Sequence, residues 1–225
     1  MRVLYDGKTN RVLKSGRAIV LQFKDSILGD SSGRVDPGGD FVVGETKGKG
    51  VASAKATAHF FSLLKKAGIP NHFVKVRSDS EIEIRMAKRI PIEVIYRALA
   101  YGSFLRRYAG YVQPMAKLDI VEFTLKADAL GDPMLEREVI VKLGLANRTE
   151  VNLMEKIARK AAGIIADDLV KRSLRLVDLK LEFGRIGRKL LVIDSLSGDT
   201  MRVYDEKQGK VLDQIELARG LGLIN

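Results

Sequence analysis

The chain has 225 residues, of which 46% are hydrophobic and 30% are charged, and this size suits one large globular domain or two small ones. It has no cysteine and only two histidines, which excludes disulfide scaffolds and thiol nucleophiles and nearly excludes histidine-rich metal centres. No stretch reaches the ~18 apolar residues of a membrane span and no signal peptide is evident, so we expect a cytoplasmic protein. The formal net charge of +11 predicts an anionic partner, which composition alone leaves open between nucleic acid, acidic protein and phosphorylated metabolites.

The first third of the sequence has the pattern of an antiparallel meander. Turn signals separate short apolar runs, at residues 2–5, 11–13 and 18–23. Residues 29–50 contain seven glycines, which predicts a long loop. The loop leads into a helix predicted from Val51 to Ala67 and closed by Gly68 and Pro70.

The rest of the chain mixes strands and helices without βαβ alternation, so we expect an α+β fold. Strands are predicted at 72–76, 81–86 and 118–125, and a final hairpin at 175–183 and 190–194. Pro91 is predicted to open one helix, and Asp132 with Pro133 to start a short second one that ends before Gly144. The longest helix is predicted from Thr149 to about Arg172.

The segment around Lys180 is the most informative for chemistry. On a strand, Asp178, Lys180 and Glu182 share one face, while the apolar residues between them share the other. A turn near Gly187 would place Asp194 opposite Lys180. Two carboxylates beside a lysine can form an oxygen site for Mg²⁺ that holds nucleotide phosphates; a solvated ladder of salt bridges has the same spacing, and both interpretations stay open.

Two glycine–lysine segments could contact phosphates. At 47–50, backbone amides and ammonium groups at a helix start could bind an anion, although the segment matches no established phosphate-loop pattern and a solvated loop explains it equally well. In the first hairpin turn, Gly7 and Lys8 could close over phosphates, but a tight turn alone also accounts for Asp-Gly.

A basic run between Arg85 and Arg107 contains one acid, Glu93. Arg97 lies among apolar residues, so it needs an anionic ligand or a buried carboxylate, and the nearby Ser103 could add a hydroxyl. An internal ion pair with Glu93, one helical turn earlier, is the alternative.

Taken together and in order, these segments resemble the SAICAR synthetase family (phosphoribosylaminoimidazole-succinocarboxamide synthases). The resemblance covers most of the chain and is most specific in LVDLKLEFG at 176–184. The other matching segments lie at 4–8, 47–50, 67–73, 90–94, 102–103, 126–134 and 194–202.

The resemblance implies an ATP- and Mg²⁺-dependent ligase that joins L-aspartate to the carboxylate of CAIR, the carboxylated aminoimidazole ribonucleotide, through an acyl phosphate. Such a mechanism relies on positioning and charge neutralisation, which a histidine-poor chain can provide. The implied nucleotide-binding residues are Gly7, Lys8, Met86, Glu182 and Asp194, of which Glu182 and Asp194 would hold Mg²⁺. The implied catalytic residues are Lys126, Asp178 and Lys180, and the implied ribonucleotide-binding residues are Arg97, Ser103 and Arg202.

The implied architecture has two lobes with ATP between them, an antiparallel β-rich lobe of residues 1–86 and a larger α+β lobe of residues 87–225. The resemblance also implies small-molecule substrates, no nucleic-acid or membrane partner, and a homo-oligomer, expected to be a dimer. Several positions depart from the family pattern, among them Asn10, Ala98, Ala127, Ser195 and Gly198. They keep two alternatives open, a non-catalytic nucleotide- or RNA-binding paralogue and a sibling ligase for another amino acid.

Overall fold

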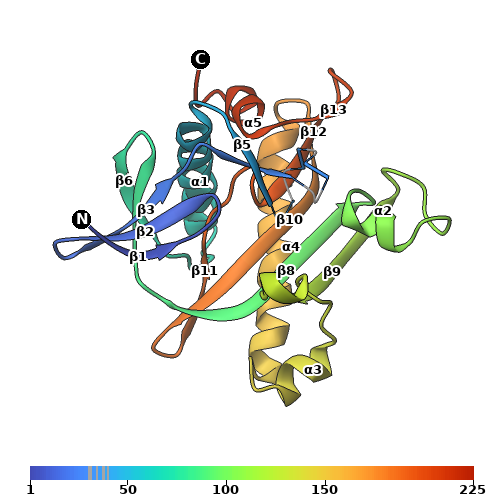
Figure 1. Ribbon diagram of the computed structural model, residues 1–225. Helices are drawn as coiled ribbons and strands as arrows, with labels where there is room; N and C mark the ends of the chain where they lie inside the picture. Colours follow the sequence, from blue (N-terminus) through green and yellow to red (C-terminus); the bar gives the residue numbers. More distant parts are fainter. Residues whose placement is uncertain (30–31, 34, 37–38, 40) are drawn as a thin grey trace.

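The structure is a computed structural model that describes residues 1–29, 32–33, 35–36, 39 and 41–225. Two large antiparallel sheets form two lobes, a two-stranded sheet accompanies them, and helices lie between and behind the large sheets (Figure 1). This confirms the predicted α+β fold with a β-rich first lobe. Within the described part of the chain, no helix is long and apolar enough to span a membrane.

The first lobe contains a five-stranded sheet in the order β1-β2-β3-β7-β6. Its strands are β1 (Arg2–Asp6), β2 (Asn10–Ser15), β3 (Ala18–Phe23), β6 (Phe73–Ser78) and β7 (Glu81–Ile84). The meander β1-β2-β3 is as predicted. The predicted loop at 29–50 needs a correction, because β5 (Phe41–Glu45) lies within it and pairs with β4 (Ser26–Gly29); its residues 30–31, 34, 37–38 and 40 lie outside the described residues.

The second sheet runs in the order β13-β12-β10-β8-β9, with β11 paired to β10. Its strands are β8 (Lys88–Leu99), β9 (Lys117–Leu125), β10 (Leu174–Ile186), β11 (Lys189–Ile193), β12 (Met201–Asp205) and β13 (Lys210–Val211). The two long strands β8 and β10 cross the whole lobe side by side (Figure 1). Their central position makes them the supports of the site described below.

The prediction of a helix that begins at Pro91 is wrong, because this segment is strand β8. Proline lacks the N–H that a sheet ladder needs, and it is tolerated here because the register between β8 and β10 shifts between Glu182 and Gly184. Alternate residues of the strand are fully buried: Ile90, Ile92 and Val94. These residues alternate with the period of two that is typical of a strand. Apolar residues further along the segment have a spacing that also fits a helix, and this led to the wrong prediction.

The helices are α1 (Lys49–Lys66), α2 (Ser103–Arg107), α3 (Arg137–Lys142), α4 (Arg148–Val170) and α5 (Gln214–Gly220), with a 3₁₀ turn at Asp128–Leu130. Helix α4 matches the predicted long helix, and a capping box of Asn147 and Glu150 starts it. The short helix α3 starts later than predicted. Asp132 does not cap it; its carboxylate accepts a hydrogen bond from the Ala127 amide at 2.6 Å, within the preceding turn.

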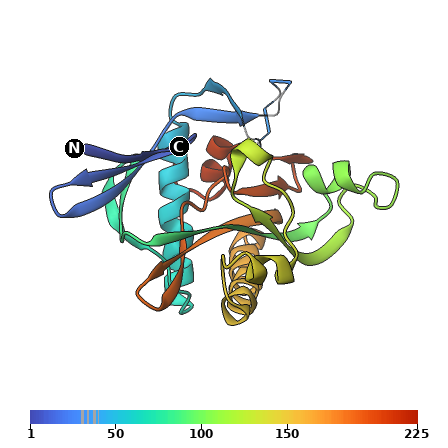
Figure 2. The same ribbon diagram turned by 60° about the horizontal axis from the view of Figure 1, so that its bottom comes forward.

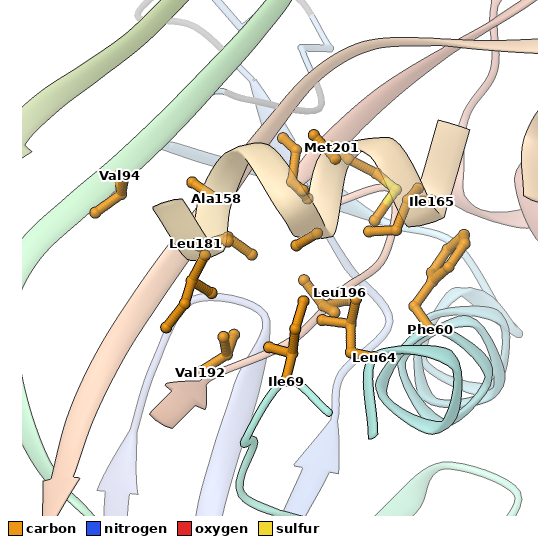
Figure 3. Packing of buried hydrophobic residues seen from close by; sticks show 14 of the residues in the cluster. Phe60, Leu64, Ile69, Val94, Ala158, Ile165, Leu181, Val192, Leu196 and Met201 are labelled. Atoms are coloured by element: carbon orange, nitrogen blue, oxygen red, sulfur yellow. The ribbon is translucent and has the colours of Figure 1, made fainter. Parts of the chain in front are cut away.

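The main hydrophobic core lies between the second sheet and α1, α4 and α5. Figure 3 shows Leu181 of β10 and Met201 of β12 near Ala158 and Ile165 of α4, with Phe60 of α1 at the side. The opposite face of α1 packs against β3 and β7 of the first lobe in a smaller cluster, which includes Leu21 and Ile82. Helix α1 thus joins the two lobes, and Figure 2 shows it between the first sheet and α4.

Candidate active site

Strand β10 presents the predicted ionic face to the junction of the lobes. Leu179, Leu181 and Phe183 are at most 1% exposed and belong to the core, so the alternate residues point away from it. Those alternate residues are Asp178, Lys180 and Glu182, and they line the cavities on that face of the sheet.

Three cavities that share lining residues follow one another along this ionic face, and together they are called the channel below. An apolar cavity of about 260 Å³ lies between the lobes, a central one of about 90 Å³ follows, and an arginine-rich one of about 270 Å³ ends the row. The first two share Glu182 and Asp194 as lining residues, and the last two share Lys180.

Glu182, which is 7% exposed, and the partly buried Asp194 form a pair of carboxylates at the centre of the channel. Burial, and then the charge of Asp194, raise the pKa of Glu182 to about 7; burial also raises the pKa of Asp194. Two like charges held together in this way favour a bound cation. Among the described residues no group of three or more acidic or histidine ligands gathers, so a metal here would need oxygens from a substrate as well.

The register that brings Asp194 to this pair differs by one residue from the prediction. Glu182 pairs with Ile193, so Asp194 is not opposite Lys180. Its backbone has a φ of 65°, which ends the β11 ladder. The Asp194 carbonyl accepts from Nε2 of His72 at 2.9 Å, and its carboxylate accepts from the Asn10 amide at 3.1 Å.

Lys126 and Lys180 both contact Glu93 of β8, at 3.2 Å and 2.8 Å. Burial lowers the pKa of Lys126, but the nearby carboxylates, Glu93 first, outweigh it and raise the pKa overall. For Lys180, burial likewise lowers the pKa, and the charge of Glu93 outweighs this effect, so the pKa is also raised. Both side chains therefore stay ammonium groups at neutral pH and can stabilise negative charge, but they cannot act as general bases.

Gly7 and Lys8 lie in the turn between β1 and β2 and line the central cavity. Lys24 fixes this turn by donating to the Gly7 carbonyl at 2.6 Å. Lys8 reaches across to the second lobe, where its ammonium group lies 3.0 Å from the carboxylate of Asp128. The turn thus covers the channel from the first lobe.

Met86 lies between β7 and β8, is 58% exposed and lines the apolar cavity. The cavity walls combine residues from both lobes, such as Val12 and Ile193. A flat, mostly apolar ring system suits such a slot.

Arg97 is 2% exposed at the other end of the channel. The alternative of an ion pair with Glu93 is wrong: on a strand the two residues do not form a helical i,i+4 pair, and Arg97 instead bonds Glu122 at 2.8 Å and Asp178 at 3.2 Å. It also donates to the Ser103 hydroxyl at 3.0 Å. The serine therefore joins the arginine, as the sequence suggested.

Arg202 of β12 completes this end of the channel. Its Nη1 donates to Asp178 at 2.7 Å, and its guanidinium lies 5.9 Å from the centre of the Tyr101 ring. A Cβ on Gly102 would come within 3.1 Å of the guanidinium, so this glycine gives the arginine its space. Asp178 thus brings the two predicted arginines together, and Arg97 in turn bonds the predicted Ser103.

The sequence leaves the start of α1 open between a phosphate site and a solvated loop, and the structure shows that its donors already have partners within the protein. The amides of Gly48 and Gly50 donate to the carboxylate of Asp25, which already occupies the helix N-terminus. Lys49 is 1% exposed and its ammonium group bonds Asp199 at 2.7 Å. Lys49 and Asp199 therefore form a buried ion pair with a structural role.

Sequence reasoning missed several acids that organise the channel. Glu93 links the two lysines, and Glu122 and Asp36 contact the arginines. The one signal in the sequence was an acid amid apolar residues, Glu93 between Ile92 and Val94. Their partners are distant in the chain, so spacing alone did not identify them.

Comparisons with known proteins identify the relatives of this chain. A family model described as SAICAR synthetase matches residues 3–217. The phosphoribosylaminoimidazole-succinocarboxamide synthase of Clostridium tetani is 37% identical over 97% of this chain and 98% of its own length, and that of Caldivirga maquilingensis is 38% identical over 95% and 86%. Among solved structures, the synthase from Ehrlichia chaffeensis has a TM-score of 0.89 at 25% identity and covers both chains fully. A type-2 SAICAR synthetase in complex with ADP has a TM-score of 0.84 at 30% identity, covering 95% of this chain and 88% of that one.

Proposed function

Because the chain belongs to the SAICAR synthetase family, we propose that its three-part channel is where the family's reaction takes place. The protein is a ligase that forms a C–N bond between L-aspartate and CAIR at the expense of ATP, giving SAICAR, ADP and phosphate. The observation that carries the placement is the channel itself, which runs from an apolar slot through a carboxylate pair and two lysines to a cluster of arginines.

We assign ATP to the apolar and central cavities. The adenine ring would lie beside Met86, and the phosphates would extend under the turn of Gly7 and Lys8. The structure of a relative in complex with ADP supports nucleotide binding by this fold. The position of the γ-phosphate would then be near Lys180, between the two ends of the channel.

Glu182 and Asp194 are suited to hold Mg²⁺. Glu182 is buried and Asp194 is partly buried, both line the channel, and their mutual repulsion is relieved by a divalent cation. Carboxylates are ligands that Mg²⁺ prefers, together with substrate phosphates. When bound, the ion would supply neutralisation of phosphate charge during transfer.

We assign the ribonucleotide to the arginine-rich cavity, where Arg97, Ser103 and Arg202 would hold its phosphate. Its carboxylate would then point toward the central cavity. A carboxylate oxygen attacks the γ-phosphorus of ATP, ADP leaves, and an acyl phosphate remains. The amine of L-aspartate attacks the acyl carbon, loses a proton, and releases phosphate as the amide forms.

The residues around the reacting centre would act by charge and position. Lys126 and Lys180, kept cationic by Glu93, would stabilise the oxygens that become more negative. Asp178 would hold Arg97 and Arg202 in place at the edge of that centre. The cytoplasmic location and the dimeric state stay predictions.

The test is a reconstitution with ATP, MgCl₂, CAIR and L-aspartate. We expect ADP release that needs all four components, with SAICAR formed in equal amount and detected by its absorbance or by mass spectrometry. ADP release without aspartate-dependent product, from a protein that melts cooperatively, would contradict the assignment. Replacing aspartate by other amino acids in the same assay separates this reaction from that of a sibling ligase.

A further inference from the structure

Asp36, in the segment between β4 and β5, lies at the arginine end of the channel. Its carboxylate accepts a hydrogen bond from Nη2 of Arg202 at 2.8 Å, and Nη1 of Arg106 lies 3.9 Å from its other oxygen. The backbone supports this position, since the Asp36 amide donates to the Leu28 carbonyl at 3.1 Å and the Asp36 carbonyl accepts from Gly39 at 2.8 Å. A carboxylate from the first lobe therefore bridges two arginines of the second.

Arg202 has an N–H that Asp36 does not satisfy. The side chain is 8% exposed, and its Nε is, within the described part of the chain, a buried donor without a hydrogen-bond partner. Leaving such a donor unpaired costs free energy. A phosphate group has more acceptor oxygens than a carboxylate and can accept from Nε and Nη2 together.

The charges of this end of the channel also leave room for a dianion. Arg97, Arg106, Arg107 and Arg202 carry four positive charges, and the strand acids Glu122 and Asp178 carry two negative ones. These four arginines outnumber the two strand acids, and Asp36 adds a negative charge that a bound phosphate would replace.

We propose that Asp36 is an internal competitor of the ribonucleotide phosphate: its carboxylate binds Arg202 in the empty enzyme and leaves when the phosphate binds, and it thereby sets the affinity of this subsite. The inference rests on the proposed function, which assigns that phosphate to Arg97, Ser103 and Arg202. The phosphate can bind only to protein molecules in which Asp36 has left Arg202. The apparent Kd for the phosphate therefore equals the intrinsic Kd divided by the fraction of such molecules. A ligand that carries a dianion displaces Asp36 more readily than one that carries a single charge.

The experiment compares the wild type with Asp36→Asn, which keeps the shape and an acceptor oxygen but removes the charge. We expect the Kd for inorganic phosphate, measured by calorimetry, and the KM for CAIR to fall roughly five- to tenfold. Asp36→Ala, which also removes the acceptor, should tighten phosphate binding at least as much. Glu45→Gln removes the same charge from the same β4–β5 hairpin, and its Kd and KM should match the wild type.

The two proposals can fail separately. Unchanged or weaker phosphate binding in both folded Asp36 variants overturns the competition, even if SAICAR is formed at the wild-type rate. Tighter phosphate binding in a protein that makes no SAICAR supports the competition and contradicts the proposed function. Equal tightening in Glu45→Gln would show a general charge effect and also overturn the role of Asp36.

Discussion

Glu182 illustrates how the fold changes the chemistry of a single residue. Its carboxyl is 7% exposed and faces Asp194, and burial followed by that charge raises its pKa to about 7. An acid whose pKa is higher in the folded than in the unfolded protein destabilises the fold once ionised. Without a metal ion this cost is absent below the unfolded pKa of about 4.3 and grows as the pH rises through 7.

Replacement of this acid therefore separates the metal site from the fold. We expect Glu182→Gln to lower kcat at least about a hundredfold, since charge neutralisation at the phosphates is lost. At pH 8 without divalent ions, the variant should melt at a higher temperature than the wild type, and the difference should shrink toward pH 5. Added MgCl₂ should raise the melting temperature of the wild type but not of the variant.

Glu206→Gln, at an exposed position after β12, is the matched control. Its turnover and its response to MgCl₂ should equal those of the wild type. Near-normal turnover of Glu182→Gln would remove this residue from the metal site.

At the scale of elements, α1 and α4 are held together by a polar contact outside the channel. Nε2 of His59 on α1 lies 2.8 Å from the Asp168 carboxylate of α4, whose other oxygen pairs with Arg172 at 3.1 Å. Burial raises the pKa of Asp168, but the hydrogen bonds from His59 and Arg172 outweigh it, so the net shift is downward. The contact stabilises the folded state above the unfolded pKa of Asp168 and loses this effect as the pH falls through the lower folded pKa.

We expect Asp168→Asn to lower the free energy of unfolding by about 1–2 kcal/mol at pH 7, measured by urea denaturation. The difference from the wild type should fade below about pH 4, and kcat should not change, because the pair lines no part of the channel. Asp167→Asn, one residue earlier and exposed, should leave stability unaltered. Equal losses in the two variants would show that helix charge, not the contact with His59, is responsible.

At the scale of the whole molecule, the two lobes contribute different ends of one channel. The strands β1–β3, β6 and β7 precede Met86 and β8–β13 follow it, while α1 packs against both lobes. We keep the division into residues 1–86 and 87–225 as a proposal on this basis. The turn of Gly7 and Lys8 belongs to the first lobe, and Ser103 with its arginines belongs to the second.

This arrangement predicts that substitutions at the two ends affect different substrates. Lys8→Gln should raise the KM for ATP about tenfold, because a charge-assisted contact is lost, and should leave the KM for CAIR within about twofold. Ser103→Ala should raise the KM for CAIR about fivefold, the cost of one neutral hydrogen bond, and should leave that for ATP unchanged. Steady-state kinetics with one substrate varied at a time measures both.

Lys14→Gln, exposed on the same β1–β2 hairpin, controls for the loss of a lysine from the first lobe. A rise in both KM values for Lys8→Gln would indicate that the turn shapes the whole channel and does not act on ATP alone.

The sequence by itself determined the features that depend on near neighbours in the chain. The alternation around Lys180, the long helix α4 and the meander β1-β2-β3 follow from local periodicity and turn chemistry, and they appear as predicted. The motifs in their order were enough to indicate the family. The structural inferences use residues a few positions apart, where backbone geometry alone fixes which side chains share a face.

Only the tertiary structure decided which distant charges meet. It made the Pro91 segment a central strand, moved the register of Asp194 by one residue, and gave Arg97 the partners Glu122 and Asp178. It also placed Asp36 on Arg202, 166 positions away in the chain. Pairings of this kind depend on strand order and sheet register, which arise from packing of the whole core and leave no periodic signal in the sequence.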